Sequence, residues 1–489
     1  MHRWKIRLLT ALAVACGASP AAADTLQEAL AKAYRDNPTL EGARAGLRVT
    51  DETVPIERSA ALPSVSGTAG YNEFVYDSNA FGGPARQATA GLSLGVPIFR
   101  GGATRNAIRA AETRVLAGRA DLRATESAIF SQVVNAYMNV IAQEALVGLS
   151  RNNVEVLGIN LEATSDRFEI GDLTRTDVAQ SEARLALARG DLRSAEANLI
   201  AAREDYIALV GDAPVDLQPP PPLPNLPENV GTAVDVALEN NPDIIATARQ
   251  AQAAGFDIRV AGSTRLPRID VTTGADYGTF LGSLPGGPAV ASSNASTGVA
   301  VGARATIPLF QGGLPAALER QAQARASFAL EQAIAVERGV IAQVRASYSS
   351  WRASLAIIAS TQAAVDAAAL SLEGVRAENT VGNRTVLDIL DAQRELLSAQ
   401  VQLITARRNA YVAGFSLLAA MGLAEARDLG LEGDGPLYDP VVNYDRVRGI
   451  VWDWARDPDP VAQSPRTVDV PAQNAEIPEA REVDEQFQP

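Results

Sequence analysis

The clearest pattern along the chain is a hydrophobic period of two that gives way, twice, to a period near three and a half. Apolar residues alternate with small or polar ones from Ala88 to Ile98, and again from Ile269 to Tyr277 and from Val299 to Ile307. This alternation predicts β-strands with one apolar and one polar face. Strands of about ten residues with such faces occur in membrane barrels, and a soluble hairpin packed on a core shows the same pattern.

Long helical segments follow each set of strands. Apolar residues recur at seven-residue steps in the first set at Val133, Val140, Val147, Val154, Leu161 and Phe168, then at Val178, Leu185, Leu192, Leu199 and Tyr206, and in the second set at Val344, Trp351, Ile358, Val365 and Leu372, then at Ile389, Leu396, Leu403, Ala410 and Leu417. This spacing predicts helices that pack as coiled coils. A helix from Ala103 to Phe168 would be roughly 100 Å long at about 1.5 Å per residue. Because Gly171 and Gly382 then reverse the chain, we expect two long antiparallel helical hairpins.

The two sets of elements are copies of one unit. Residues 36–38 (Asp-Asn-Pro) recur as residues 240–242 (Asn-Asn-Pro), 204 positions later, whereas residues 96–102 recur as residues 307–313, 211 positions later. A seven-residue insertion in the loop-rich part of the second hairpin explains the change of offset. Self-similarity at a nearly fixed spacing indicates an internal duplication.

Each copy is expected to begin with a capped helix. Thr25 is followed by Glu28, and Thr232 is followed by Asp235, which is the spacing of a capping box. Residues 212–231, with four consecutive prolines at 219–222, join the copies and predict a stiff extended connector.

The first 23 residues have the features of a secretory signal. Basic residues precede an apolar run, and Ala21-Ala22-Ala23 offers a cleavage site. Cys16 offers a second route, lipid attachment, although Ala13 stands where such signals usually carry leucine. The only histidine, His2, and the only cysteine lie in this segment, so a cleaved chain would lack disulfides, Cys or His metal ligands and His-dependent catalysis.

Charge narrows the class of partner. The net charge of the whole chain is −14, and removal of three basic residues with the leader leaves 40 basic against 57 acidic residues, or −17. An acidic surface argues against nucleic acid as a partner.

The number of strands raises a problem of closure. Two hairpins supply four strands, whereas membrane barrels begin at about eight strands and an open edge in hydrocarbon leaves backbone groups unsatisfied. If these strands cross a membrane, several chains must share one barrel.

Four stretches carry a specific resemblance. VPIFRGG from Val96, IPLFQGG from Ile307, RFEIGDLTRTDV from Arg167 and VGNRTVLDILDAQREL from Val381 resemble the TolC outer-membrane factors, and the similarity extends from about residue 25 to 423. The resemblance implies an α+β, mainly α fold of two tandem repeats, each with a β-hairpin and long antiparallel helices. It further implies a homotrimer with a 12-stranded outer-membrane β-barrel continued by a periplasmic α-helical barrel.

With this resemblance the chain divides into six expected regions. They are a signal peptide (1–23), the first repeat (24–211), the proline-rich linker (212–231), the second repeat (232–423), a C-terminal periplasmic segment (424–456) and a disordered acidic tail (457–489). The tail is rich in proline and acid with little apolar content, which predicts disorder.

The resemblance also implies a gate at the periplasmic tip, where helical turns form an iris closed by polar links. It assigns Thr176, Asp177 and Arg384 to this gate, and a salt bridge between Arg384 and Asp177 would be a reversible latch. Asn379 stands where the family often has tyrosine, so this link of the gate would be a weaker hydrogen bond.

The same tip carries two carboxylates that the resemblance assigns to the channel entrance. Asp388 and Asp391, one helical turn apart, would form two stacked acidic rings in a trimer and favour cations. From the residues alone, they are also explained as first-turn acids after Thr385 that are stabilised by the helix dipole. Gly171 and Gly382 are the expected tip turns, where an adaptor would dock.

The function implied is a passive outer-membrane exit duct for type I protein secretion or multidrug efflux. The expected partners are a homotrimer, a periplasmic adaptor, an inner-membrane ABC or proton-driven pump, and outer-membrane lipid, with no cofactor, no metal and no nucleic acid. A soluble periplasmic coiled-coil adaptor is the alternative, although it would not need two alternating hairpins. Paired carboxylates also suggest a hydrolase, but no nucleophile motif or phosphate loop accompanies them, so no catalytic residue is assigned.

Overall fold

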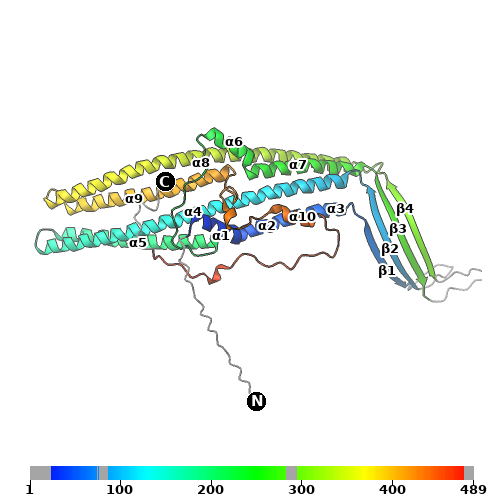
Figure 1. Cartoon of the computed structure of the whole chain (residues 1–489), viewed down its shortest axis with the longest axis horizontal. Coiled ribbons are helices and arrows are strands. Elements are labelled where there is room, and N and C mark those ends of the chain that lie inside the picture. The colour runs from blue at the N-terminus through cyan, green and yellow to red at the C-terminus, as the bar shows by residue number, and fades with distance from the viewer. Residues whose placement is uncertain (1–23, 74, 76–85, 282–294, 478–489) are drawn as a thin grey trace, which may run out of the picture.

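The computed structural model describes residues 24–73, 75, 86–281 and 295–477. The predicted leader with His2 and Cys16, and most of the two hairpin loops with the insertion, lie outside the described residues. The molecule is long and narrow, with two helical hairpins ending at one end and a sheet at the other (Figure 1).

Both copies contain the same elements in the same order. The first consists of α1 (Leu26–Asp36), α2 (Pro38–Asp51), α3 (Thr53–Ser59), β1 (Ser64–Glu73), β2 (Arg86–Phe99), α4 (Ala103–Glu169) and α5 (Arg175–Val210). The second consists of α6 (Val230–Asn240), α7 (Pro242–Gly262), η1 (Ser263–Arg265), β3 (Arg268–Phe280), β4 (Ala295–Thr306), α8 (Leu314–Thr380) and α9 (Val386–Ala420). Then come η2 (Leu431–Asp434), α10 (Pro440–Val447) and η3 (Thr467–Asp469).

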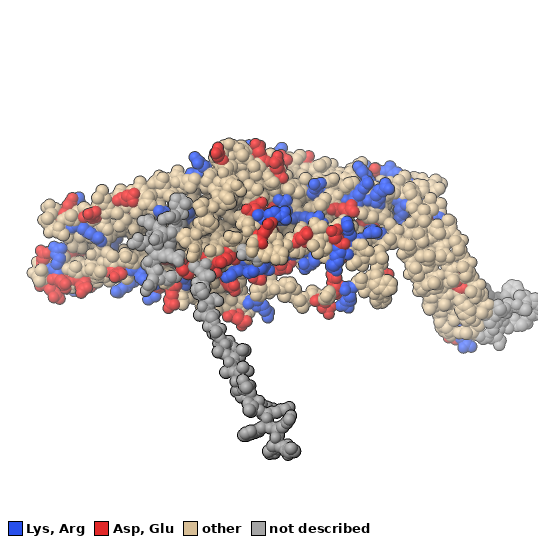
Figure 2. All heavy atoms as spheres, viewed as in Figure 1, with Lys and Arg blue, Asp and Glu red and all other residues tan. Residues whose placement is uncertain are grey.

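The four strands form one antiparallel sheet in the order β1-β2-β3-β4. The register places Val65, Leu92, Val299 and Val301 on one face, where between 58% and 77% of each side chain is exposed. The opposite face carries polar or small residues such as Ser66, whose Oγ lies 2.7 Å from Ser93 Oγ. Charged side chains are sparse on the visible surface of the sheet, in contrast to the helices (Figure 2). The alternation in the sequence therefore predicted β2, β3 and β4 and their two unlike faces.

The strand-to-helix turn is built the same way in both copies. Gly102 and Gly313 precede the long helices with φ of +81° and +84°, values that L side chains rarely adopt. Each turn is followed by a helix of 67 residues. In the middle of α4 the seven-residue stripe forms an inner face, since Val133, Val140 and Val147 are fully buried.

The repeated Asn-Pro motif joins three elements in each copy. Asn37 Oδ1 accepts hydrogen bonds from the first free amides of α2, and its Nδ2 donates to Leu209 O at the end of α5, 3.0 Å away. Asn241 does the same for α7 and donates to Ala420 O of α9 at 2.9 Å. The prolines follow at the first helical position, where a missing N–H costs nothing.

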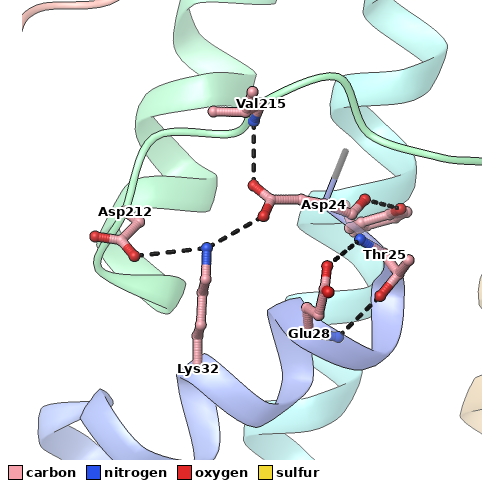
Figure 3. Close-up of polar contacts among 7 residues, drawn as sticks. Asp24, Thr25, Glu28, Lys32, Asp212 and Val215 are labelled. Atoms are coloured by element: carbon pink, nitrogen blue, oxygen red, sulfur yellow. Dashed lines mark hydrogen bonds and ion pairs between the residues drawn. The ribbon is translucent and has the colours of Figure 1, made fainter. Parts of the chain in front are cut away.

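The start of the described chain is held against the connector. The Asp24 N–H donates to Val215 O at 3.0 Å, and the Asp24 carboxylate accepts from Val215 N and pairs with Lys32 (Figure 3). Lys32 also reaches Asp212, 3.6 Å away. The predicted capping box of Thr25 and Glu28 is present beside it.

The predicted cap at Thr232 is wrong. The helix begins earlier, at Val230, because the side chain of Asn229 accepts the hydrogen bond from the Thr232 N–H at 2.9 Å. Asparagine is at least as good a cap as threonine, and Asn229 stands three positions before Thr232.

The described part of the C-terminal tail is extended and contacts the helices. Arg203 of α5 is 8% exposed, and its guanidinium donates to Asn474 O and Glu476 O, both at 2.9 Å. These contacts differ from the disorder expected for residues 457–489. Since residues 478–489 lie outside the described part, the expectation for the whole tail stays a prediction.

Candidate functional site

The two tip turns of the hairpins have one geometry. Gly171 and Gly382 both adopt φ of +83°. The next residue of each turn donates back to the helix, Asp172 N to Arg167 O at 2.9 Å and Asn383 N to Glu378 O at 3.0 Å. This is the glycine-terminated helix end that satisfies the last free carbonyls, and it places both turns at the end of the molecule remote from the sheet (Figure 1).

A capping box follows each turn. Asp177 accepts from the Thr174 N–H at 2.9 Å and from the Thr174 hydroxyl at 2.7 Å. Asp388 accepts from the Thr385 N–H and hydroxyl, both at 2.8 Å. Hydrogen bonds from the threonine side chain and backbone lower the pKa of Asp177, and those from the Thr385 backbone and side chain lower the pKa of Asp388. Both carboxylates are therefore ionised at neutral pH.

The expected latch is not formed within one chain. Arg384 Nε lies 2.6 Å from Glu378 Oε2, and this hydrogen bond and its charge raise the pKa of Arg384. Asn379 Nδ2 donates to Arg384 O at 2.7 Å. Thr176 is exposed beside Asp177. The tip residues thus lie on or near the surface, with Arg384 paired to Glu378 and Asp177 to Thr174.

Asp391 has a partner that the sequence did not indicate. Its Oδ1 lies 3.0 Å from Arg184 Nη2 of α5 and 3.9 Å from Arg394. Because Arg184 belongs to the first copy and Asp391 to the second, this ion pair joins the two hairpins. Local sequence patterns cannot reveal how the two hairpins pack on each other. The one signal in the sequence is a difference between the copies: Arg184 is basic, whereas its equivalent 211 positions later, Glu395, is acidic.

A small core supports this ion pair. Leu157, Leu185 and Leu390 are buried together between α4, α5 and α9. Asn160 Nδ2 donates to Gln393 Oε1 at 3.0 Å, and Gln393 is 7% exposed. The two hairpins of one chain are thus in direct contact close to the tip.

The described residues contain no group of three or more His, Cys, Asp or Glu side chains arranged to hold a metal ion. Asp388 and Asp391 are the two acids assigned to the entrance, and one of them is used in a helix cap while the other is paired with arginine. Within the described chain the tip therefore combines ionised acids with arginines on an exposed surface (Figure 2).

Comparisons with known proteins agree with this architecture. A family model described as outer membrane efflux protein matches residues 27–212 and 233–423. The chain is 34% identical over 443 residues to the outer membrane efflux protein BepC of Brucella suis biovar 1, covering 90% of this chain and 93% of BepC. It is 26% identical over 430 residues to TolC of Escherichia coli, covering 86% and 87%. Its fold is similar to the Campylobacter jejuni CmeC outer membrane channel, with a TM-score of 0.71, 18% identity and coverage of 87% and 89%.

Proposed function

Because the chain belongs to the outer membrane efflux protein family, and is therefore a non-enzymatic export channel of the outer membrane with a periplasmic helical extension, we propose that three copies form one passive exit duct. TolC-family proteins form trimeric channels. Four strands from each of three copies would close a 12-stranded barrel, which removes the free edges that a four-stranded sheet would leave in hydrocarbon.

The observation that carries the proposal is the exposed, two-faced sheet. One face is apolar and open, with Val299 and Val301 76% and 77% exposed, and the other is polar. The apolar face would then contact lipid, and the polar face would contact the water-filled lumen of the barrel. The family membership excludes the alternative of a soluble adaptor.

The surface of α8 supports a shared tube. Among the described helices, α8 is the one long and apolar enough, by length and composition, to cross a membrane, and 11% of that apolar stretch is buried. Since α8 is continuous with the helical hairpin at the periplasmic end, a neighbouring chain is the partner that would cover it. Phe328, Leu330 and Ile334 are exposed on the same helix, at 72%, 57% and 43%.

For the gate, we propose that Arg384 of one chain pairs with Asp177 of the next when the tip is closed, with Thr176 and Asn379 adding hydrogen bonds. Asp388 and Asp391 would line the entrance as two rings. The Arg184–Asp391 pair offsets the charge of the second ring, so the ring at Asp388 would dominate the attraction of cations.

The proposed gate has a direct test. Replacing Arg384 with serine removes the cation of the latch, so the reconstituted trimer should conduct more than wild type in planar bilayers. Arg193→Ser is the control, because Arg193 is an exposed arginine of α5 that pairs with Glu196 and is assigned neither to the latch nor to the entrance rings. Unchanged conductance together with unchanged antibiotic sensitivity would count against the gate.

Energy for transport must come from partners. We propose that a periplasmic adaptor docks at the tip turns around Gly171 and Gly382 and links the duct to an inner-membrane ABC or proton-driven pump. The similarity to a protein named for efflux favours small molecules as cargo, with type I protein secretion as the second candidate. Deletion followed by measurement of both drug accumulation and secreted protein separates the two cargoes.

A further inference from the structure

We propose that the loop of residues 448–456, the tryptophan loop, inserts its apolar side chains into the periplasm-facing phospholipid leaflet of the outer membrane. The loop follows α10, in the segment that the family match does not reach. It carries exposed apolar residues on both sides of the exposed Asp453, with Val451 65%, Trp452 69% and Trp454 81% exposed.

An ion pair closes the base of the loop. The Arg446 guanidinium pairs with both carboxylate oxygens of Asp457, at 2.7 and 2.9 Å, so the residues before and after the loop are joined. Ala455 N donates to Trp452 O at 3.0 Å, which closes a turn at its tip. The exposure of the tryptophans therefore belongs to an ordered projection and not to a loose chain end.

The helix that carries the loop is docked near the sheet. Asn443 of α10 donates to Asp51 of α2 at 2.7 Å, and Tyr444 packs against the cluster formed by Val54, Ala111 and Val115. These contacts fix α10 against the end of the first copy that leads into the membrane-spanning strands.

A second contact brings the loop itself to the boundary of the sheet. Arg58 of α3 donates from Nη1 to Arg448 O at 2.9 Å. Only six positions separate Arg58 from Ser64, the first residue of β1, and Ala60 and Ala61 line one hollow together with residues 97–99 at the end of β2. In Figure 1 the C-terminal chain passes beside α3 before it turns back along the helices.

The same boundary already exposes large apolar residues. Phe99 ends β2 and is 45% exposed, and its equivalent in the second copy, Phe310, follows β4 and is 89% exposed. Aromatic residues gather at the two water interfaces of a membrane, where tryptophan buries its ring and keeps its N–H near polar groups. Trp452 and Trp454 would extend this aromatic belt beyond the barrel.

The charges around the loop indicate which lipid it would contact. Arg448 pairs with Asp445 at 3.3 Å, and Arg456 pairs with Asp459 at 2.6 Å. Because the arginines next to the tryptophans are paired with acids, the loop has no surplus of positive charge to attract anionic lipid. We therefore assign it to zwitterionic phospholipid, with an interaction that is insensitive to salt.

The test measures the depth of a spin label in the full-length trimer, reconstituted in nanodiscs of zwitterionic phospholipid. Cys16→Ser removes the native cysteine, and Trp454→Cys provides the labelling site. Val468→Cys is the matched control, because Val468 is also 81% exposed but lies three residues from Pro465, which packs near Gly211 at the end of α5. We expect the label at position 454 to be several-fold less accessible to a water-soluble nickel complex than the label at 468, and more accessible to oxygen, at low and high salt alike.

Two results would overturn the proposal. Equal accessibility of both labels to nickel would mean that the loop is in water, and protection of position 454 from both nickel and oxygen would mean that another chain covers it. A second variant, Trp452→Ser with Trp454→Ser, should lower the thermal stability of the trimer in nanodiscs but not in a lipid-free polymer belt. The inference rests on the outer-membrane location; conductance measured on the same labelled trimers shows separately whether the proposed duct has failed.

Discussion

The long helices of the two copies, α4 and α8, have the same length and the same glycine start but different surroundings. Helix α4 contacts α1, α2, α3, α5, α7 and α9, whereas α8 contacts α6, α7 and α9. As a result Val140 and Val147 are fully buried, while their equivalents Trp351 and Ile358 are half-buried. The two copies therefore share the same backbone elements, but within one chain α4 is covered by more elements than α8 is.

The places where the copies differ in residue type indicate why. Arg123 of α4 pairs with Glu425 at 2.6 Å in the C-terminal segment, and its equivalent in α8 is the exposed Ile334. Arg119, whose guanidinium carbon lies 5.2 Å from the centre of the Tyr444 ring, corresponds to Leu330, which is 57% exposed. The first copy uses this surface to hold its own C-terminal segment, and we infer that the second copy uses it to hold another chain.

The largest effect is expected from charging that surface of α8. Leu330→Asp together with Ile334→Asp, one helical turn apart on the same face, should abolish the trimer, because an unpaired carboxylate buried between chains costs about 3–5 kcal/mol. Native mass spectrometry would show single chains. Val468→Asp, which places the same charge on an equally apolar but unpacked residue, should leave the trimer intact; a normal trimer from the double variant would refute the assignment of this surface.

Glu126 and Glu337 occupy equivalent positions and give the next comparison. Burial raises the pKa of Glu126 to about 7, with Glu425 adding to the rise, although the Ala426 N–H donates to it; Glu337 is exposed. A carboxyl with a raised pKa holds its proton longer in the folded chain than in the unfolded one. Stability should therefore fall as pH rises from about 4.5 to 7, by roughly 3 kcal/mol.

Chemical denaturation at several pH values tests whether stability falls as pH rises. Glu126→Gln should flatten the decline between pH 5 and 8, whereas Glu337→Gln should leave it as in wild type. If the two variants have the same pH profile, burial of Glu126 does not control the titration.

Tyr137 and Tyr348, which are 211 residues apart, should differ by less in their contribution to the free energy of unfolding. The Tyr137 hydroxyl is buried and lies 3.0 Å from Asp24 O and 2.6 Å from Gln218 O. Tyr348 makes one bond, to Glu228 O at 2.8 Å, near the surface. Tyr137→Phe should lower the free energy of unfolding by about 1–3 kcal/mol and Tyr348→Phe by about 1 kcal/mol or less. Equal shifts in thermal unfolding would contradict the difference in burial.

The smallest difference in stability is expected between the two Asn-Pro motifs, which make the same contacts in both copies. Asn37 and Asn241 are 3% and 4% exposed, and each caps one helix and donates to the end of another. Asparagine to alanine at either position should cost about 1–2 kcal/mol, with no more than about 0.5 kcal/mol between them. A large gap in denaturation midpoints would show that the two motifs have diverged in role.

Much of the fold followed from the sequence because its signals are local. The periods of two and seven, the glycines at 171 and 382 and the offset of 211 identified β2, β3, β4, the long helices and the tip turns close to their observed bounds, whereas β1 was expected only as the partner strand of a hairpin. The error at Thr232 was also local, since two good capping residues lie three positions apart and the pattern does not choose between them.

Less of the candidate site than of the fold could be predicted from the sequence. The capping role of Asp388 could be foreseen from Thr385, but Arg184 as the partner of Asp391 depends on how two hairpins pack side by side. The same is true of the Asn37 side chain, whose second bond reaches Leu209 across the fold. The latch between Arg384 and Asp177 stays a prediction, because it concerns contacts between chains.

Electron cryo-microscopy of the protein in nanodiscs tests the central claim most directly. The account predicts a threefold axis, one barrel of twelve strands, and the face of α8 with Leu330 and Ile334 packed on the neighbouring chain. A particle with one or two copies, or a trimer in which this face of α8 remains open to water, would contradict it.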